Sequence, residues 1–503
     1  MTTSSEGSKL ERWRQRLDTA LERLRERAGL IPVERLREQA TARAAAKLRA
    51  HAWPTAVRAA LARLREHDAR AYLVGGSVRD VLLDRPGDDV LDIATSRTPA
   101  EVMARFARVE PVGLEHGTVL VIEPELRFEC TTFRREGAYT DARHPDAVEF
   151  TLDPLEDLAR RDFTCNALAF DPGSGELLDP HGGVLDLEGG VLRAVGDPVL
   201  RFHEDALRPL RAARFAAVLG LALDPGTEAA LGSARERARQ VAMERVRAEW
   251  EKLMAAPRPS TGIELLRRAG LLALWMPELD ACAGVGQNRF HAYDVYEHSL
   301  RCCDAAPADK PRVRWAALLH DIGKPATRVI RRGDATFYGH QETGAELADA
   351  LLERFRFSND ERRAVVHLVR QHMFDFRRDW SDAALRRWLR RVGVEAVADL
   401  FDLRIADCIG NGLRSGYPAM LDEMRRRIRV LLATRQVLTR SDLAVDGGDV
   451  MRVLGVPPGP RVGEVLEVLL QRVIDDPDAN GRDVLLAAIE ALGNEGSDTG
   501  REA

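Results

Sequence analysis

Apolar and polar residues follow three successive patterns along the chain. In the first 52 residues, apolar positions such as Leu10, Trp13 and Leu17 recur at intervals of three and four, which predicts two amphipathic helices. Between residues 53 and 195 the apolar runs are short and β-branched, and Gly, Pro and Asp separate them. That pattern predicts a sheet with a few helices. From about residue 200 the period is helical almost throughout, so we expect an α+β head followed by a long helical part.

Individual strands and helix ends can be predicted from the same pattern. The strand candidates are the runs AYLVGG, VLDIAT, GTVLVIE, RFECTTF and AVEFTL. In the helical part, breaks fall at residues 256–260, 283–288, 305–311 and 455–460. Pro32 suits the first turn of the second N-terminal helix. We expect the two N-terminal helices to pack on the body of the protein; the alternative is that they form a homodimer.

Composition narrows the class of protein. A chain of 503 residues is too long for one core and indicates about three domains. No run of 18 apolar residues occurs, so we expect neither a membrane span nor a membrane partner. The N-terminus lacks the apolar core of a secretory signal and the six cysteines form no C-x-x-C pair, which favours a cytoplasmic protein with reduced thiols. The net charge of −5 does not indicate nucleic-acid binding, although arginines cluster within residues 377–391 and 425–429.

A glycine turn followed by aspartates is the first candidate site. The strand AYLV runs into Gly75-Gly76-Ser77 and a helix, where the backbone can approach a phosphate and Arg79 can add a charge-assisted bond. Asp88, Asp89 and Asp92 follow. Neighbouring carboxylates repel unless a divalent cation lies between them, and two Mg²⁺ ions there would activate a hydroxyl and neutralise a leaving pyrophosphate. A solvated acidic turn is the alternative on these residues alone.

Five ordered motifs resemble those of the class II tRNA nucleotidyltransferase and bacterial poly(A) polymerase family. They are YLVGGSVRDVLLDRPGDDVLDIAT, FECTTFRREGAYTDARHPDAVEF, EDLARRDFTCNA, FHEDALRPLRAARFAAVLG and the neck segment ERVRAEWEKL. The resemblance implies that Asp89 and Asp92 are catalytic and hold Mg²⁺. It further implies a nucleotide-binding set of Gly75, Gly76, Ser77, Arg79, Arg161, Asp162, Asn166, Asp205, Arg208, Arg211 and Arg214.

Within that set, the resemblance implies that Asp205 and Arg208 read the Watson–Crick edge of CTP or ATP. They stand at positions i and i+3, so a helix would place them on one face. A carboxylate accepts from the exocyclic amine that cytosine and adenine share, and a guanidinium donates to a ring nitrogen or carbonyl. An ordinary surface ion pair is the alternative. The flexible loop with Asp141, Arg143 and His144 resembles the element that the family needs for adding the final adenosine.

The acidic motif departs from the family pattern. The family has Asp-x-Asp, whereas this chain has Asp89-Val90-Leu91-Asp92. In a regular strand, positions i and i+3 point to opposite faces. Both carboxylates therefore reach one metal only if a β-bulge absorbs the extra residue.

Six of the twelve histidines fall between residues 291 and 372. His298 lies in a helical run, and His320-Asp321 ends a second one, with Gly323 expected as its C-cap. This stretch resembles the HD phosphohydrolase superfamily, whose pattern is H…HD…D. The resemblance implies metal ligands at His298, His320, Asp321 and Asp407, with Asp399 and Asp402 as competitors for the last position and His340 and His372 as further ligands of a two-metal site.

The resemblance also bears on the metal and on two further residues of this stretch. The metal would be a divalent transition ion such as Mn²⁺ or Ni²⁺, and Lys324 would contact a phosphate. His291 is expected to be structural. A degenerate site retained as a scaffold is the alternative.

The resemblance implies a CCA-adding enzyme that acts on the tRNA 3′ end with CTP and ATP. A poly(A) polymerase or an enzyme that adds only A is the nearest alternative, and an HD phosphohydrolase with a non-catalytic head is an alternative from another class. The expected fold is α+β, with a small mixed sheet in the nucleotidyltransferase head and helices beyond it. The predicted domains are an N-terminal helical extension at 1–52, the head at 53–195, a neck at 196–282, an HD domain at 283–412 and a helical tail at 413–503.

Overall fold

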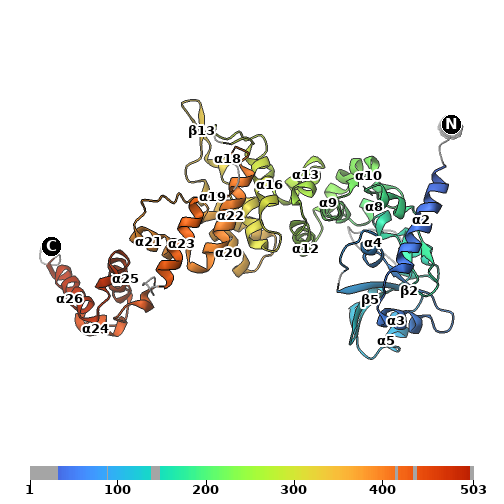
Figure 1. Cartoon of the computed structure of the whole chain (residues 1–503), viewed down its shortest axis with the longest axis horizontal. Helices are drawn as coiled ribbons and strands as arrows, with labels where there is room; N and C mark the ends of the chain where they lie inside the picture. The colour runs from blue at the N-terminus through green and yellow to red at the C-terminus, as the bar shows by residue number, and fades with distance from the viewer. Residues whose placement is uncertain are drawn as a thin grey trace. The chain divides into compact units, whose positions relative to one another are not determined.

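The computed structural model describes residues 32–87, 89–136, 148–289, 291–413, 417–433 and 439–498 (Figure 1). The chain forms two compact units, Met1–Leu274 and Trp275–Ala503. The first unit has an α+β head and the second is largely helical, so the predicted fold class is confirmed. No helix in the described ranges is long and apolar enough to cross a membrane.

A seven-stranded mixed sheet in the order β3-β4-β5-β2-β1-β8-β9 forms the centre of the head. Strands β2 and β5 run parallel, and the other neighbouring pairs are antiparallel. The strands are β1 Ala71–Val74, β2 Val90–Thr95, β3 Val109–Gly113, β4 Thr118–Glu123, β5 Leu126–Thr132, β8 Ala169–Phe170 and β9 Leu177–Leu178.

The two faces of this sheet have different surroundings. Phe128 and Cys130 of β5 are buried, and the Phe128 ring meets that of Phe106 with centroids 5.5 Å apart. Arg127 and Glu129, which alternate with them, are exposed. The alternation places one face of β5 in the core and leaves the other for a site.

Four of the five predicted strands belong to this sheet. The fifth run, AVEFTL, forms β7 (Val148–Phe150), which pairs with β6 (Arg134–Glu136) in a separate ribbon. The sequence did not predict β3, β8 or β9, which are either broken by Pro111 or only two residues long.

Helices complete the first unit. The second of the two predicted N-terminal helices is α2, which packs on α7 and α4, and its Arg43 forms an ion pair with Glu188 at 2.7 Å. The first predicted helix lies outside the described residues. The helices are α2 Val33–Ala50, α3 Thr55–Arg65, α4 Gly76–Leu82, α5 Pro99–Met103, α6 Pro154–Ala159, α7 Gly183–Glu188, α8 Pro198–Glu204, α9 Arg208–Leu219, α10 Pro225–Ala230, α11 Arg235–Ala238, α12 Met243–Met254 and α13 Pro259–Arg268.

The second unit contains a helical bundle, a β-hairpin and a C-terminal helical cluster. The bundle helices are α16 Val295–Ala305, α17 Pro311–Leu319, α18 Lys324–Thr327, α19 His340–Arg354, α20 Asn359–Gln371, α21 Asp382–Val392, α22 Val397–Gly410 and α23 Met420–Ala433. The hairpin of β12 (Val329–Arg331) and β13 (Asp334–Thr336) interrupts a region that the sequence predicted as helical.

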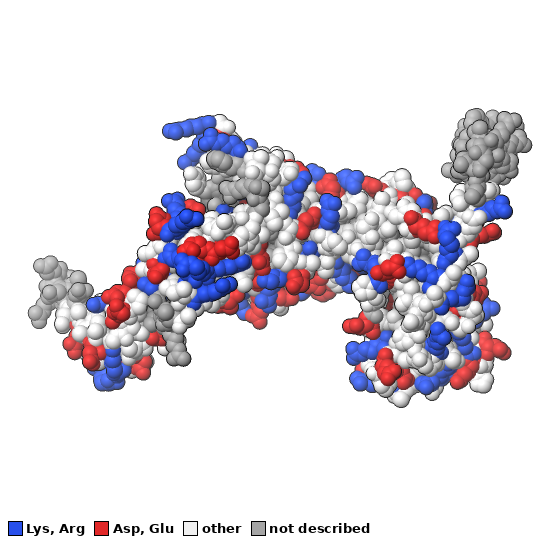
Figure 2. Space-filling view, in the orientation of Figure 1, with Lys and Arg blue, Asp and Glu red and all other residues white. Residues whose placement is uncertain are grey.

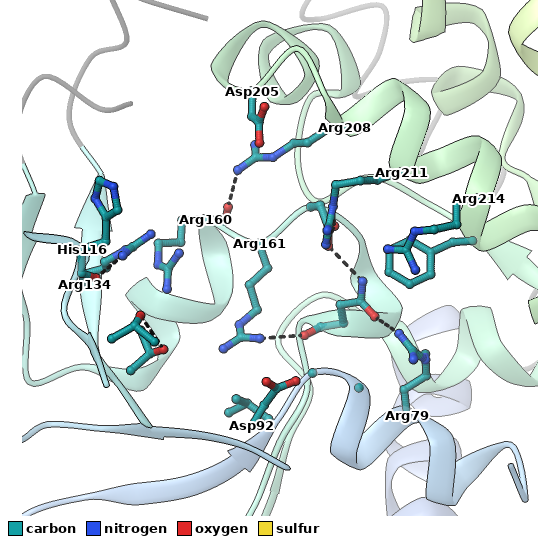
Figure 3. Close-up of a pocket in the computed structure, with 18 of the residues that line it drawn as sticks. Arg79, Asp92, His116, Arg134, Arg160, Arg161, Asp205, Arg208, Arg211 and Arg214 are labelled. Carbon is teal, nitrogen blue, oxygen red and sulfur yellow. Dashed lines mark hydrogen bonds and ion pairs between the residues drawn. The ribbon is translucent and has the colours of Figure 1, made fainter. Parts of the chain in front are cut away.

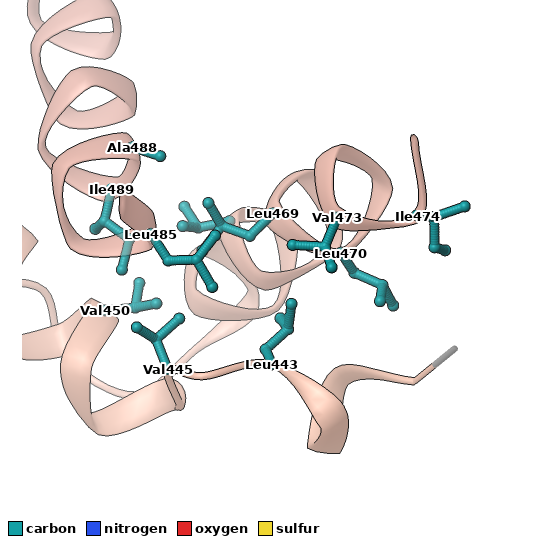
Figure 4. Packing of buried hydrophobic residues seen from close by; sticks show 11 residues of the cluster. Leu443, Val445, Val450, Leu469, Leu470, Val473, Ile474, Leu485, Ala488 and Ile489 are labelled. Carbon is teal, nitrogen blue, oxygen red and sulfur yellow. The ribbon is translucent and has the colours of Figure 1, made fainter. Parts of the chain in front are cut away.

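The C-terminal helices pack around a core of their own. These helices are α24 Gly447–Leu454, α25 Pro460–Asp475 and α26 Arg482–Asp498. Fully buried residues such as Val450, Leu485 and Ile489 meet between them (Figure 4). Each of the four breaks predicted in the helical part lies at a boundary between helices. Three of them contain the first residue of α13, α17 or α25, which in each case is a Pro, the residue favoured at a helix start.

Candidate active site and metal centre

An arginine-lined pocket of about 540 Å³ opens in the first unit. Of the described residues that line it, eight are arginines and one is a lysine, whereas three are aspartates. Figure 3 labels Arg79, Arg161 and Arg211 among them. Guanidinium groups form bidentate, charge-assisted bonds with phosphate oxygens. The pocket is therefore suited to a polyanion such as a nucleoside triphosphate.

The glycine turn forms part of the pocket wall. Gly75 has a φ of +61°, and a Cβ there would lie 3.0 Å from Nη1 of Arg161 and 3.5 Å from Oδ2 of Asp92. A side chain at this position would be strained and would crowd both groups. Ser77 lies outside the pocket lining, but its Oγ accepts a 2.8 Å hydrogen bond from the backbone N–H of Asp92 and so ties α4 to β2.

One hydrogen-bond network fixes most of the predicted nucleotide-binding residues. Arg79 donates to Asn166 at 2.6 Å, Asn166 donates to Asp162 at 3.0 Å, and Arg211 donates twice to Asp162 at 2.6 and 2.8 Å. The network continues through Glu249, which is buried. It runs in order through Arg79, Asn166, Asp162, Arg211, Glu249 and Arg214.

The carboxylate of Asp162, at the centre of this network, is kept ionised by its neighbours. Burial alone would raise the pKa of Asp162, but Arg211 and Asn166 outweigh it and hold the pKa well below the ordinary value. Arg161 lies beside the network and donates to Asp157 at 3.1 Å. Asp157 therefore orients the guanidinium group of Arg161, which lines the pocket.

The two predicted catalytic aspartates do not lie together. Asp92 lines the pocket, whereas Asp89 lies at an exposed bend and lines a different hollow with Arg108 and Arg127. Strand β2 pairs with β5 in unbroken register from Val90 to Thr95, so no bulge absorbs the extra residue. The register instead places Glu129 of β5 directly opposite Asp92. Parallel neighbours in register point to the same face, so Glu129 is the carboxylate that the sheet brings beside Asp92.

Asp205 and Arg208 both line the pocket, but the prediction that they share one helix face is wrong. Helix α8 ends at Glu204, Asp205 is extended with φ −132° and ψ 108°, and α9 begins at Arg208. The physical reason is Pro209, which has no N–H to bond the carbonyl of Asp205 and so prevents a continuous helix. Arg211 and Arg214 follow Arg208 on α9.

Each member of this pair is held by a partner of opposite charge. Arg245 of α12 lies 3.1 Å from Oδ2 of Asp205. Arg208 donates to Glu204 and to two backbone carbonyls, those of Arg201 and Arg160, at 2.9 and 3.1 Å. The side chains that would read a base are therefore oriented in the protein itself.

Several members of the site were not predicted from the sequence. Arg134 and Lys252 line the pocket, while Glu129 and Glu249 act from beside it. Arg245, Glu249 and Lys252 all lie in the neck segment ERVRAEWEKL, whose charges at helical spacing were the available signal. The loop residues Asp141, Arg143 and His144 lie outside the described residues.

A second site, in the bundle, collects six predicted metal ligands. Nε2 of His298 lies 3.2 Å from Nε2 of His320 and 3.3 Å from Asp407, and Nε2 of His340 lies 3.2 Å from Nε2 of His372. Asp321 stands between the two groups, because its Oδ2 is 3.2 Å from His320 and its Oδ1 is 3.4 Å from His340.

The histidines of this site are set up as ligands. Nδ1 of His320, His340 and His372 each lies 2.6–2.9 Å from a backbone carbonyl three residues earlier, which fixes the proton on Nδ1 and leaves Nε2 for a metal. Burial, together with the nearby His320, lowers the pKa of His372 to about 3, so this ring is neutral. Burial would raise the pKa of Asp321, but His320 and Lys324 hold it well below the ordinary value. Burial would lower the pKa of His320, but Asp321 outweighs it and raises that pKa. Imidazole nitrogens beside an ionised carboxylate are ligands that suit a divalent transition metal.

The two other aspartates considered for the last ligand position form ion pairs with a lysine instead. Asp399 and Asp402 bind Lys310 at 3.2 and 2.6 Å, which leaves Asp407 as the last carboxylate of the group.

The prediction that Gly323 is a C-cap is wrong, because its φ is −79°. Its missing side chain instead lets the turn lie against the backbone of α19, where a Cβ would be 2.5 Å from the N of Gly344.

The six predicted metal ligands form a candidate metal centre, which opens into a pocket of about 350 Å³. Lys324 donates to Asp321 and to Gln287, each at 2.7 Å, and Arg404 donates to Asp407 at 2.8 Å. Both cations line the pocket. Cys302, which the sequence analysis did not select, places its Sγ 3.5 Å from Nε2 of His298.

Three parts of the chain match known protein families. Residues 71–193 match the Poly A polymerase head domain, residues 220–282 the probable RNA and SrmB-binding site of polymerase A, and residues 290–411 the HD domain. With the arginine pocket beside Asp92, these matches define the class as nucleotidyltransferases with a poly(A)-polymerase-type head.

Similarity to individual proteins narrows the class. The CCA-adding enzyme of Streptococcus gordonii is 33% identical over 86% of this chain and 95% of its own length, and that of Geobacillus thermodenitrificans is 35% identical over 85% and 94%. A solved structure of the Bacillus stearothermophilus CCA-adding enzyme in complex with CTP matches 88% of this chain and 98% of its own, with 30% identity and a TM-score of 0.67. The chain belongs to the CCA-adding enzyme family of nucleotidyltransferases.

Proposed function

We propose that this protein completes the 3′ end of tRNA by adding C, C and A from CTP and ATP with release of pyrophosphate. The observation that carries the proposal is the arginine-lined pocket, in which Asp205 and Arg208 accompany Asp92 and the glycine turn. Family membership over most of the chain supports it. A base-reading pair is needed only where the protein itself selects the incoming nucleotide.

In the proposed reaction the 3′-hydroxyl of the RNA attacks the α-phosphorus of the nucleotide. Bound Mg²⁺ would lower the pKa of that hydroxyl and neutralise the leaving pyrophosphate. Asp92 and Glu129 would hold the cation from neighbouring strands. Arg79 and Arg161 would bind the triphosphate, and Asp205 would accept the exocyclic amine of C or A while Arg208 donates to the same edge.

The choice of carboxylates can be tested with three isosteric variants. Asp92→Asn, Glu129→Gln and Asp89→Asn are compared for addition of labelled C and A to tRNA that ends before CCA. Asp92→Asn and Glu129→Gln should each lower kcat at least 100-fold, because each removes a ligand charge. Asp89→Asn should stay within threefold of the unchanged protein. The reverse order for Glu129 and Asp89 would overturn the pairing derived from the strand register.

The product distinguishes the proposed function from its nearest alternative. With CTP and ATP together, tRNA lacking its end should gain three nucleotides and stop. A long A tail on an unrelated RNA would instead identify a poly(A) polymerase, and addition of A only to tRNA ending in CC would identify an A-adding enzyme.

A second function is favoured by the metal centre in the bundle. We infer that this site hydrolyses phosphoesters, because six ligands converge with Nε2 of three histidines available and Lys324 and Arg404 beside them. Water attacks phosphorus, the P–O bond to the ester group breaks, and the leaving oxygen takes up the proton that the water loses. Metal-depleted protein should release no phosphate from p-nitrophenyl phosphate and should regain activity with Mn²⁺ or Ni²⁺. Activity that does not depend on Asp321 would contradict the assignment.

A further inference from the structure

The hairpin of β12 and β13 carries an exposed basic surface beside the metal centre. Arg328, Arg331 and Arg332 are exposed, and none of the three forms an ion pair with a carboxylate in the described ranges. Figure 2 shows basic side chains gathered at the end of this hairpin. Arginines without acidic partners are available for an external anion.

An aromatic side chain lies between these arginines and the metal centre. Tyr338 is 77% exposed and lines the same pocket as His320 and Asp321. The guanidinium of Arg331 lies over the Tyr338 ring, 5.6 Å from its centroid. Met373, which is also exposed, lines the pocket as well. An exposed ring beside a basic groove is the arrangement on which bases of single-stranded nucleic acid stack.

We propose that the hairpin is a binding platform for a single-stranded RNA end, which it directs into the metal centre. The terminal base stacks on Tyr338, the preceding phosphates contact Arg331 and Arg332, and the terminal phosphate faces Asp321. The substrate of this site is then an RNA chain with a terminal phosphate rather than a free nucleotide. The proposal rests on the hydrolase function for its reaction, but the binding itself is independent of turnover.

Crosslinking tests the platform directly in the full-length protein. The probe is a twelve-nucleotide RNA with a 3′-phosphate and 4-thiouridine at its last position; a second probe carries the thiouridine at position four. Irradiation and mass spectrometry should map the terminal crosslink to residues 328–340. The double variant Arg331→Ala with Arg332→Ala should reduce that crosslink at least fivefold. Arg363→Ala, which removes an exposed arginine from α20, should leave it unchanged.

Hydrolysis and salt dependence give two further readouts. Phosphate release from the RNA should fall about tenfold in Tyr338→Ala and in the double variant. Release from p-nitrophenyl phosphate should change less than twofold in the double variant, because this substrate has no preceding phosphates for Arg331 and Arg332 to contact. The slope of log KM for the RNA against log salt should decrease in magnitude by about 1.4 in the double variant, since each lost phosphate contact accounts for about 0.7.

The outcomes separate the platform from the reaction. Terminal crosslinks that map only to other parts of the chain would overturn the platform, as would equal loss of both substrates in the double variant. If neither substrate is hydrolysed but the crosslink maps to residues 328–340, the platform holds and the hydrolase function fails.

Discussion

Among single residues, buried counter-charges position the arginines of the nucleotide pocket. Asp162 and Glu249 are buried and lie against Arg211 and Arg214, while Asp157 holds Arg161. A buried ion pair whose members have several partners contributes orientation more reliably than stability, but removing one member leaves the other uncompensated. The acidic residues are therefore as necessary to this site as the arginines.

Removing the Asp162 charge should show this in a pH-dependent way. Burial alone would raise the pKa of Asp162, but Arg211 lowers it overall, so the carboxylate stabilises the fold above its unfolded pKa of about 3.9 and loses that effect as pH falls. Asp162→Asn should destabilise the head by about 3 kcal/mol at pH 7. The difference should be about 1 kcal/mol smaller at pH 3. Hydrogen exchange in urea, read on peptides from β1 and β2, measures it, and a pH-independent difference would refute the charge argument.

Arg245 should affect nucleotide choice more than turnover. Because it lies 3.1 Å from Asp205, Arg245→Met should free that carboxylate to rotate and weaken discrimination of CTP against UTP about tenfold. The change should appear mainly as a raised KM for CTP and ATP. Arg247→Met is the matched control, since Arg247 pairs with Glu251 on the same helix. An unaltered CTP-to-UTP ratio in Arg245→Met would show that Asp205 needs no orienting cation.

At the level of elements, breaks and close contacts decide where the functional residues lie. Pro209 separates α8 from α9 and sets Asp205 in extended backbone. Helices α16 and α22 approach closely at Gly410, where a Cβ would overlap Sγ of Cys302 and lie 2.8 Å from its backbone N. Those two helices carry His298 and Asp407, so their spacing sets the geometry of the metal centre.

Gly410→Ala should therefore damage the metal centre. The added methyl group should separate α16 from α22, destabilise the bundle by about 2 kcal/mol and weaken Mn²⁺ binding at least tenfold. Gly463→Ala is the control, because a Cβ in α25 meets only Nη1 of Arg440 at 3.5 Å. That variant should be as stable as the unchanged protein or slightly more so. Thermal unfolding and metal titration measure both, and normal Mn²⁺ affinity in Gly410→Ala would contradict the spacing argument.

Across the whole molecule, the two candidate sites lie in different compact units. The nucleotide pocket is built from residues 74–252 and the metal centre from residues 288–411, each within one unit. The C-terminal helices add a further hydrophobic cluster around Val450 and Leu485 (Figure 4). The residues of each candidate site therefore pack within one unit and not within the other.

Loss of the transition metal should leave nucleotide addition intact. Asp321→Asn removes the carboxylate that stands between the two ligand groups and should abolish Mn²⁺ binding and phosphate release. Addition of C and A to tRNA should remain within twofold, because the head carries its own carboxylates. Measuring both activities on the same preparation provides the control. A parallel loss of nucleotide addition would show that the two sites are coupled.

The sequence by itself determined the fold class, with an α+β head followed by helices, most of the strands and helix ends, and the residue types that both candidate sites contain. Hydrophobic period and proline positions are local properties, and the motifs carry their chemistry in contiguous residues. The tertiary structure alone decided which carboxylate accompanies Asp92. Strand register brings in Glu129 and leaves Asp89 outside. It also decided that Arg245 and Glu249, from a later helix, complete the pocket, because contacts between distant segments depend on packing that no local pattern records.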